Sequence, residues 1–259
     1  MPTRRRLDAE LVRRGLVGSR TEAQRLITVG GVTVFGKPSA RPATLVAAGD
    51  PIEITEGDRW ASRAGGKLAA ALAAFDVPVA GRRALDVGAS TGGFTDVLLA
   101  NGAESVTAVD VGYGQLVWRL RTNPRVVVHD RTNFRTADIA ALGAPFDLVV
   151  IDVSFISLTL LAAGLSRAGR DGTDYVVLIK PQFEVGREAV GSGGIVRDPA
   201  AHRGAVATVA AALSAEAIAP RALIPSPVRG TKGNLEFLLH AVLGAAPVAL
   251  PLLLDEVPV

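Results

Sequence analysis

The chain has 259 residues, 49% of them hydrophobic, so it can bury a full core as one large domain or as one domain plus a small module. It contains no cysteine, which excludes disulfides and thiolate metal sites and favours a reducing, cytoplasmic compartment. Residues 1–41 carry nine basic and three acidic side chains, a net charge of +6 against +3 overall, so residues 42–259 carry −3. This asymmetry indicates a polyanionic partner for the N-terminal segment, with a merely solvated basic face as the alternative.

Neither a membrane protein nor a metal protein is expected. The N-terminal arginine cluster is followed at once by Asp8 and Glu10 and by no apolar segment, unlike a secretion signal. The longest uncharged stretch, 237–254, contains Pro247 and Pro251, and its first half has the pattern of a strand rather than of a membrane-spanning helix. The histidines show no metal-ligand spacing: His129, His202 and His240.

The first sixty residues have the pattern of a small module with two helices and a small sheet. Three leucines at roughly helical spacing predict a helix within residues 7–18. A second helix is predicted to follow Ser19, because Ser19 and Glu22 have the spacing of a capping box. Short alternating strands are predicted at 32–34 and 52–54, around a Gly-Lys-Pro turn.

Beyond a junction at 57–60, strands alternate with longer helical segments. This alternation predicts an α/β domain whose sheet is mainly parallel. Seven segments are the candidate strands: 84–87, 105–109, 126–129, 148–151, 175–179, 222–224 and 236–241.

A glycine-rich turn, Asp86-Val-Gly-Ala-Ser-Thr-Gly-Gly93, joins the first of these strands to a helix predicted at 94–99. Glycines let a ligand approach the backbone closely, and the start of the helix presents unpaired N–H groups. The spacing Gly-x-x-x-Gly-Gly differs from the dinucleotide fingerprint, and the carboxylate of Asp86 would repel a pyrophosphate. The carboxylate of Asp86 would not repel the cationic S-adenosylmethionine, so this turn indicates a methyl-donor site.

Two more acids follow the next two strands. Asp110 can accept hydrogen bonds from both hydroxyls of a ribose, and Asp130 can face an adenine amino group. Carboxyl ends of parallel strands meet at one edge of a sheet, so Asp86, Asp110 and Asp130 are predicted to bracket one crevice. Together they favour the methyl donor over a nucleotide phosphate.

The chain has 24 arginines but only four lysines, which are Lys37, Lys67, Lys180 and Lys232. Arginine supplies positive charge almost everywhere, and only lysine can lose its proton in a protein, so the lysines need their own explanation. Lys180 follows one strand candidate, and Asp152 has the same place after another. Lys67 precedes a helix predicted at 68–75, and Glu236 begins the last strand candidate.

Two lysines and two carboxylates at one sheet edge suit methylation of a ribose 2′-hydroxyl. This hydroxyl barely ionises at neutral pH, so it needs a base or a cation that stabilises the developing alkoxide. A lysine becomes a useful base only when burial or a neighbouring cation lowers its pKa. The Asn/Asp-Pro-Pro-aromatic motif typical of base methylation is missing from the sequence. Two surface salt bridges are the alternative reading.

Several motifs make the chain similar to a known family. The head, with Gly18-Ser-Arg-Thr-Glu-Ala and Gly36-Lys-Pro, resembles the S4-type (αL) RNA-binding domain, and the body resembles the FtsJ-like 2′-O-ribose methyltransferases. Together they resemble the haemolysin-A (TlyA-type) family of 16S and 23S rRNA 2′-O-cytidine methyltransferases. The motifs of the body are Ser62-Arg-x-Gly-x-Lys67-Leu, Leu85–Thr95, Ile151-Asp-Val-Ser-Phe-Ile-Ser157, Ile179-Lys-Pro-Gln-Phe-Glu184 and Gly230-x-Lys-Gly-Asn-x-Glu236.

The resemblance implies a Rossmann-like class I methyltransferase sheet of seven strands at 63–259, a small S4-type domain at 1–58 and a linker at 59–62. It implies that the 2′-hydroxyl is deprotonated with lysine assistance and methylated in line by a catalytic tetrad of Lys67, Asp152, Lys180 and Glu236. It places S-adenosylmethionine at Asp86, Gly88, Ser90, Gly92, Gly93, Phe94, Asp110 and Asp130. It assigns RNA binding to Arg4, Arg6, Arg20, Lys37 and Arg63.

The expected partners are rRNA or ribosomal subunits, with no membrane and no metal. The segment Ala64-Gly65-Gly66 is expected to be a flexible loop that leaves Lys67 mobile without RNA. Two other functions are the alternatives. A membrane-active haemolysin would need an amphipathic or membrane-spanning segment. A non-catalytic RNA-binding assembly factor would not need the tetrad, which is intact in this sequence.

Overall fold

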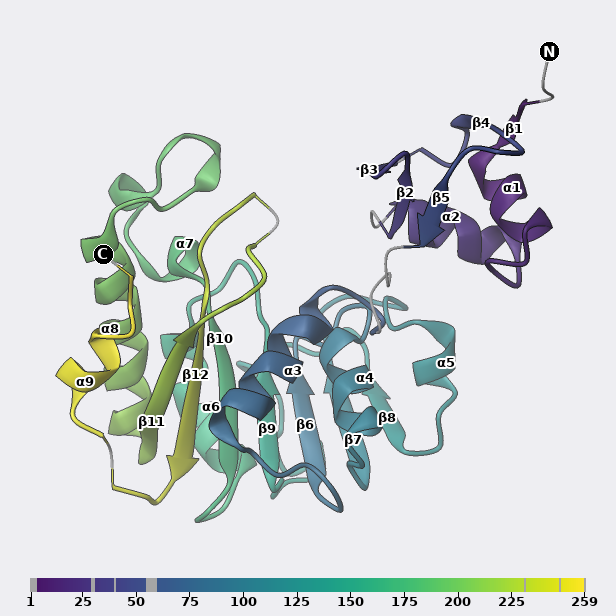
Figure 1. Cartoon of the computed structure of the whole chain (residues 1–259). Coiled ribbons are helices and arrows are strands. Elements are labelled where there is room, and N and C mark those ends of the chain that lie inside the picture. Colours follow the sequence, from purple (N-terminus) through teal and green to yellow (C-terminus); the bar gives the residue numbers. More distant parts are fainter. Residues whose placement is uncertain are drawn as a thin grey trace. The chain divides into compact units, whose positions relative to one another are not determined.

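The computed structural model describes residues 4–28, 31–39, 41–54, 60–230, 232–246 and 248–258. The chain divides into two compact units, Met1–Arg59 and Trp60–Val259 (Figure 1). The second unit starts before the predicted boundary at 63, because Trp60 is buried and the backbone N–H of Ala61 donates to the carboxylate of Asp96, 2.8 Å away. Of the predicted junction at 57–60, residues 57–59 lie outside the described residues.

The N-terminal unit contains two helices, α1 (Leu7–Arg13) and α2 (Arg20–Thr28), and two small sheets. One sheet has the order β3-β2-β5, with β2 (Val32–Val34), β3 (Lys37–Pro38) and β5 (Ile52–Ile54), and the other pairs β1 (Arg4–Arg6) with β4 (Leu45–Ala47). The predicted capping box is present in part, because Ser19 Oγ accepts the N–H of Glu22 at 3.2 Å, whereas the Glu22 carboxylate accepts the N–H of Gly18 at 2.8 Å instead of that of Ser19. Strands β1, β3 and β4 were not predicted: the three consecutive arginines of β1 show no alternation, and Lys37–Pro38 of β3 was assigned to a turn.

The second unit is built on a seven-stranded sheet in the order β11-β12-β10-β9-β6-β7-β8. All seven predicted strands are present, and only β12 and its neighbours pair antiparallel. The strands are β6 (Arg83–Val87), β7 (Ser105–Val109), β8 (Val126–His129), β9 (Leu148–Ile151), β10 (Asp174–Ile179), β11 (Ile218–Pro225) and β12 (Phe237–Leu243).

Helices cover both faces of this sheet. One face packs against α3 (Ala64–Phe75), α4 (Gly93–Ala100) and α5 (Trp118–Arg121). The other packs against α6 (Ala162–Ala168), α8 (Pro199–Ala215) and α9 (Leu250–Leu254). Three 3₁₀ turns, η1 (Leu158–Leu160), η2 (Arg187–Ala189) and η3 (Ser192–Gly194), and the short helix α7 (Pro181–Glu184) complete the unit.

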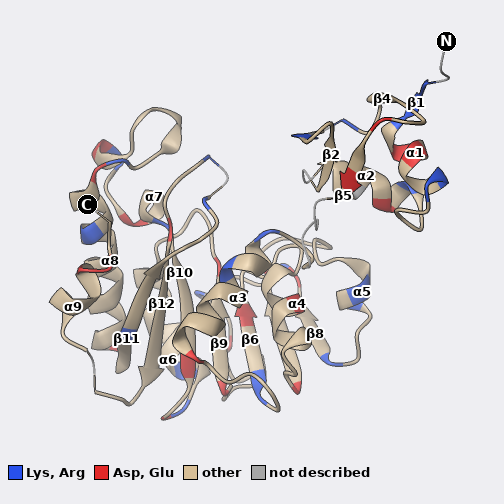
Figure 2. Ribbon diagram, in the orientation of Figure 1, with Lys and Arg blue, Asp and Glu red and all other residues tan. Residues whose placement is uncertain are grey.

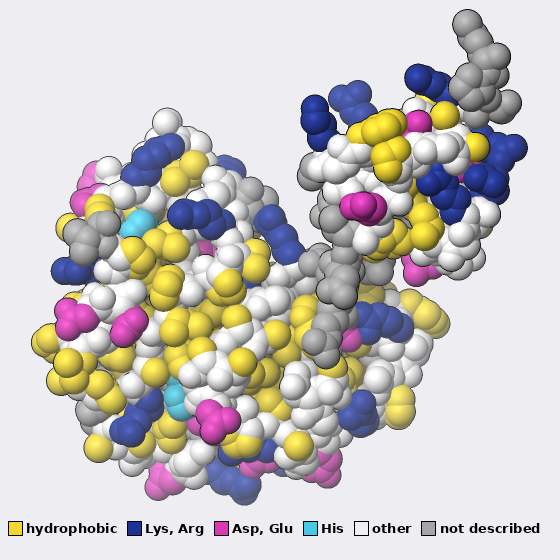
Figure 3. Space-filling view, viewed as in Figure 1, with side chains coloured by type: hydrophobic (Ala, Val, Ile, Leu, Met, Phe, Trp, Pro, Cys, Tyr) yellow, Lys and Arg dark blue, Asp and Glu magenta, His cyan; other side chains and the backbone are white. Residues whose placement is uncertain are grey.

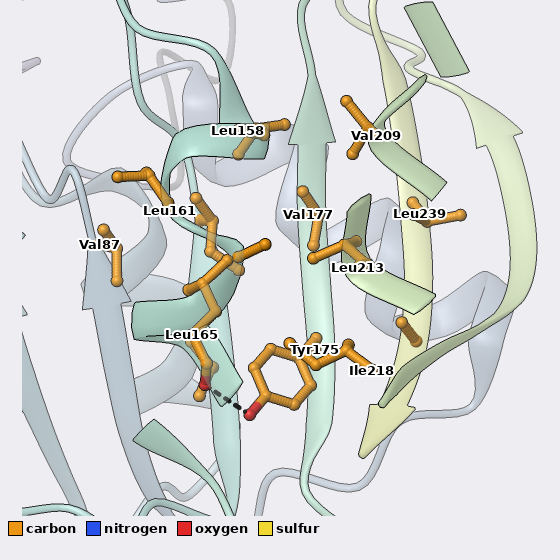
Figure 4. Packing of buried hydrophobic residues seen from close by; sticks show 14 of the residues in the cluster. Val87, Leu158, Leu161, Leu165, Tyr175, Val177, Val209, Leu213, Ile218 and Leu239 are labelled. Carbon is orange, nitrogen blue, oxygen red and sulfur yellow. Dashed lines mark hydrogen bonds between the residues drawn. The ribbon is translucent and has the colours of Figure 1, made fainter. Parts of the chain in front are cut away.

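Strand β10 shows why these segments become buried strands rather than helices. Its residues alternate between the two cores: Tyr175 and Val177 point to the α6 and α8 side, Val176 and Leu178 to the α3 and α4 side. Figure 4 shows the first of these cores, where the Tyr175 hydroxyl donates to the carbonyl of Leu165 at 2.9 Å. Burial on both faces explains the nearly continuous apolar runs from which the strands were predicted.

The topology brings the carboxyl ends of β6, β7, β9 and β10 to one edge of the sheet. Strand β12 runs the other way, so its start, Phe237, lies opposite Ile179 at the end of β10. Residues that precede β12 therefore meet residues that follow β10. This antiparallel pairing places Glu236 and Lys180 at the same edge.

Candidate functional site

A cavity of about 420 Å³ lies at this edge, and we call it the glycine-turn cavity. Of the residues predicted to bind the methyl donor, Gly88, Ser90 and Asp110 line it. The Asp110 carboxylate accepts the backbone N–H groups of Ser90 at 2.8 Å and Gly112 at 2.7 Å. Gln115 Nε2 also donates to Oδ1, at 3.4 Å, whereas Oδ2 keeps a further lone pair that can accept a hydrogen bond from a ribose hydroxyl.

Gly88 and Gly93 of the turn are required because other atoms approach their Cα atoms closely. Gly88 has a φ of +88°, and a Cβ built there would lie 2.5 Å from the carbonyl oxygen of Asp152. Gly93 begins α4, where a Cβ would collide with Ser62 Oγ. Gly88, Gly93, Ser90 and Phe94 line a smaller space of about 150 Å³ that also reaches Lys180. The turn is thus packed closely enough for a ligand to touch the main chain.

Asp86 lies beneath the turn rather than in the cavity. Its side chain is fully buried against α4, where Thr95 Oγ1 donates to Oδ2 at 2.6 Å. The other oxygen, Oδ1, has no hydrogen-bond partner among the described residues. Burial raises the pKa of the Asp86 carboxyl to about 7. Gly92 is also structural in this conformation, because a Cβ there would lie 2.7 Å from a methyl carbon of Leu116.

Asp130 follows β8 as expected, yet it is not among the residues that line the glycine-turn cavity. Its Oδ2 lies 2.7 Å from Arg121 Nη2, and this partner lowers the pKa of the Asp130 carboxyl. The cavity wall is instead supplied two to four residues further on, by Thr132, Asn133 and Phe134. The sequence contained the signal for them, since they follow the carboxyl end of the same strand.

The buried carboxyl of Asp86 predicts a pH-dependent stability. A carboxyl whose pKa is about 7 in the folded protein and about 4 when unfolded stabilises the fold below pH 4, and this stability is lost as the pH rises through 7. We expect Asp86→Asn to raise the free energy of unfolding relative to the wild type more at pH 8 than at pH 5, by up to about 3 kcal/mol.

Thermal melts of the ligand-free protein at both pH values measure this difference. Asp138→Asn, which changes an exposed carboxyl, is the matched control and should give the same difference at pH 5 and pH 8. A gain for Asp86→Asn that does not change with pH would contradict the raised pKa.

A second cavity of about 580 Å³, the lysine cavity, contains all four predicted catalytic residues, together with Arg63. Lys67 Nζ lies 2.5 Å from Glu236 Oε2, and Lys180 Nζ lies 2.5 Å from Asp152 Oδ1. Lys180 also donates to Ser154 Oγ at 2.8 Å. The contact between Lys180 and Asp152 is an ion pair without hydrogen-bond geometry, whereas that between Lys67 and Glu236 has such geometry. Ser90, Asp152 and Ser154 line both cavities, so the two spaces adjoin.

Lys67 is fixed by a helix. The expectation of a flexible loop at Ala64-Gly65-Gly66 was wrong, because these residues form the first turn of α3 and Lys67 follows inside the helix. Gly65 allows this turn, since a Cβ there would clash with the side chain of Trp60. Lys67 is only 6% exposed. Its ammonium therefore has a defined position without any ligand.

Burying these two ion pairs costs desolvation free energy, so a contribution to fold stability does not explain why they are there. Lys67 and Glu236 are almost fully buried, and taking two charges out of water offsets much of their mutual attraction. Apolar side chains of similar volume would often be as stable. Charged groups held in a cavity at the carboxyl ends of parallel strands are instead the usual arrangement of an α/β active site.

In the N-terminal unit, the buried carboxylate of Asp8 orients two arginines that were predicted to bind RNA. Asp8 is fully buried and accepts hydrogen bonds from Arg6 Nη2 at 3.0 Å, Arg20 Nε at 3.1 Å and Gln24 Nε2 at 2.9 Å. The hydrogen bond from Arg6, above all, holds the pKa of Asp8 well below its usual range. The side chains of Arg6 and Arg20 remain 43% and 56% exposed. They are thus oriented by Asp8 and still reach solvent.

The other two residues of this unit that were predicted to bind RNA are not oriented by a carboxylate that the structure describes. Arg4 and Lys37 are exposed and have no side-chain partner among the described residues. Lys and Arg segments recur along β1, α1 and β3, and their side chains cover much of the visible surface of this unit (Figures 2 and 3). A set of exposed, partly oriented cations suits the phosphates of a nucleic acid.

Comparison with known proteins agrees with this arrangement. The FtsJ-like methyltransferase family matches residues 60–242, and the S4 domain family matches residues 5–52. The 16S/23S rRNA (cytidine-2′-O)-methyltransferase TlyA of Mycobacterium tuberculosis is 50% identical over 242 residues, 92% of this chain and 90% of that protein. The chain belongs to the TlyA-type family of FtsJ-like methyltransferases.

Other members of this family carry a different name. Hemolysin A of Brachyspira hyodysenteriae is 37% identical over 239 residues, 92% of this chain and all of that protein. A solved structure from Streptococcus thermophilus, named as a hemolysin, shares 38% identity with a TM-score of 0.76 and covers 99% of this chain and 96% of its own. In the part of the chain that the structure describes, no helix is long and apolar enough to cross a membrane. The predicted class I methyltransferase sheet and S4 head are confirmed.

Proposed function

We propose that the protein transfers the methyl group of S-adenosylmethionine to the 2′-hydroxyl of cytidine in 16S rRNA, 23S rRNA or both. The observation that carries this proposal is the lysine cavity, where two lysine–carboxylate pairs adjoin the glycine turn. A pair of positioned cations suits a hydroxyl that must lose its proton. The rRNA and the cytidine are supported by the name of the 50% identical relative and by the S4 domain.

The residues present fit the methyl donor. The glycine-turn cavity offers Asp110 for a ribose, a main chain bare of side chains at Gly88, and an apolar wall that includes Phe134. When bound, S-adenosylmethionine supplies an electrophilic methyl group. Asp86 lies one layer below, where a cationic ligand would favour the ionised form of its carboxyl, and Asp130 is a further candidate near the adenine. The narrow space that joins Gly93 to Lys180 is where the two reactants would meet.

The side chains of the lysine cavity then have separate tasks. Lys180, oriented by Asp152 and Ser154, stabilises the oxygen of the 2′-hydroxyl as it loses its proton, which passes to whichever of Lys67 and Lys180 has first released its own ammonium proton. Lys67, held by Glu236, supplies the second cation or base beside it. The new O–C bond forms opposite the breaking S–C bond, so the oxygen must be aligned on that axis. Both lysines are held rigidly enough for such alignment.

Mapping of ribose methylation tests this function. Purified protein, S-adenosylmethionine carrying a labelled methyl group, and ribosomal subunits or rRNA from cells that lack the protein are incubated and analysed by mass spectrometry of nucleosides and fragments. We expect label on the 2′-oxygen of cytidine only. Label on a base, or binding of rRNA without any transfer, would contradict the proposal, and the second result would favour a non-catalytic assembly factor.

A further inference from the structure

The segments that follow β9 and β10 contact each other at two places. One is the ion pair between Asp152 and Lys180, and the other is a set of hydrogen bonds to Glu184. Strand β9 leads into the loop 152–157, and β10 leads into α7, which ends at Glu184. Glu184 Oε2 accepts the hydroxyl of Ser157 at 2.6 Å, and Glu184 Oε1 accepts the backbone N–H of Leu158 at 3.0 Å. One carboxylate thus binds the far end of the loop with both oxygens.

Between these two attachments, Val153 and Ile156 are partly buried and pack against the core, whereas Phe155 points to solvent. The backbone N–H of Asp152 donates to the carbonyl of Val87 at 3.0 Å, which ties the start of the loop to the sheet. Phe155 is 91% exposed and has a φ of +66°, a conformation that residues other than glycine rarely adopt. Its ring contacts that of Phe183, with centroids 5.3 Å apart. A strained, exposed loop of this kind persists only where its surroundings fix it.

The position of this loop matters because it borders both cavities. Asp152, Ser154 and Phe155 line the glycine-turn cavity and the lysine cavity alike. Ser154 accepts the hydrogen bond that orients Lys180. A displacement of the loop by a fraction of an ångström would therefore change the position of the ammonium relative to both reactants.

We propose that Glu184 is a positioning residue for methyl transfer, whose carboxylate fixes the loop 152–157 so that Asp152 and Ser154 hold Lys180 in place. The inference rests on the proposed function for its reaction, but its contacts are independent of that function. Ser157 also caps the 3₁₀ turn η1, since its Oγ accepts the N–H of Thr159 at 3.2 Å. Glu184 is partly buried, and burial raises the pKa of its carboxyl while the bonds from Ser157 and Leu158 lower it.

Three variants of the full chain test the proposal under single-turnover and steady-state conditions. Glu184→Ala should lower kcat by about ten- to a hundredfold, with KM for RNA within about threefold, because misplacement by about 1 Å costs up to this factor. Glu184→Gln should restore kcat to within about threefold of the wild type. Its amide oxygen can accept the N–H of Leu158, and its NH₂ group can donate to Ser157 Oγ. Ser157→Ala should lower kcat by several-fold and add little to Glu184→Ala in the double variant.

Glu188→Ala, which removes an exposed carboxylate four residues further along, is the matched control and should keep wild-type kinetics. A kcat of Glu184→Ala within twofold of the wild type would overturn the proposal. So would a Glu184→Gln variant as slow as Glu184→Ala, or a loss confined to KM for RNA. If Glu184→Ala melts at a much lower temperature, Glu184→Gln and Ser157→Ala decide the question. Failure of the wild type and of Glu188→Ala to methylate ribose would refute the proposed function instead.

Discussion

Replacing Lys180 by alanine should lower kcat for methyl transfer by about a hundred- to ten-thousandfold, while the Kd for S-adenosylmethionine stays within about threefold. Lys180 lines the lysine cavity and the narrow space beside Gly93, but it is not among the residues of the larger glycine-turn cavity. Its loss would therefore remove the cation that we propose lies beside the ribose hydroxyl, and would leave the lining of the glycine-turn cavity intact. Single-turnover kinetics and calorimetric titration of S-adenosylmethionine measure the two quantities.

Lys180→Arg separates the two tasks that a lysine can have here. Arginine keeps the positive charge but cannot lose its proton in a protein. If Lys180 stabilises the developing alkoxide, Lys180→Arg should retain part of the activity that Lys180→Ala loses; if Lys180 takes the proton, both variants should be equally slow. Melting temperatures check that the unpaired Asp152 has not destabilised the fold. Normal turnover of a folded Lys180→Ala variant would remove Lys180 from the mechanism.

The sheet was predictable from the sequence because its central strands are buried on both faces. The buried strands β7 and β9 have the bounds predicted from the sequence, and so does the partly exposed edge strand β8. The lysine and acid that follow β10 and β9 were also predictable, since parallel strands place their carboxyl ends together. Strand order then brought Glu236 to the same edge, although the strand after it starts one residue later than expected.

Other features depend on where side chains point, which sequence spacing does not determine. Asp86 and Asp130 lie at or near strand ends as expected, but the first points under α4 and the second toward Arg121. The Gly-Gly pair before Lys67 predicted a loop, yet packing of Trp60 on Gly65 overrides the low helix propensity of glycine. The hydrogen bond from Ser157 to Glu184 spans 27 residues, and no local pattern indicates it.

Removal of the N-terminal unit should weaken rRNA binding by at least about a hundredfold at moderate salt and reduce the slope of log K against log salt by about four. The shortened chain should begin at Trp60, because Trp60 and Ala61 belong to the core of the second unit and Ala61 binds Asp96. We expect this body to stay folded and to bind S-adenosylmethionine with nearly wild-type affinity. Titration of labelled rRNA at several salt concentrations measures the loss.

A variant of the full chain makes the same test without a deletion. Arg4→Ala combined with Lys37→Ala removes two exposed cations that have no side-chain partner among the described residues, so the fold should be unaffected. Binding should weaken by about tenfold or more, and the salt slope should fall by about two. Arg6→Ala and Arg20→Ala are poorer choices, since each also takes a donor from the buried Asp8. Arg167→Ala, an exposed arginine of α6, is the control. Unchanged rRNA affinity and salt slope in the chain that begins at Trp60 would refute the role of the head as the RNA anchor.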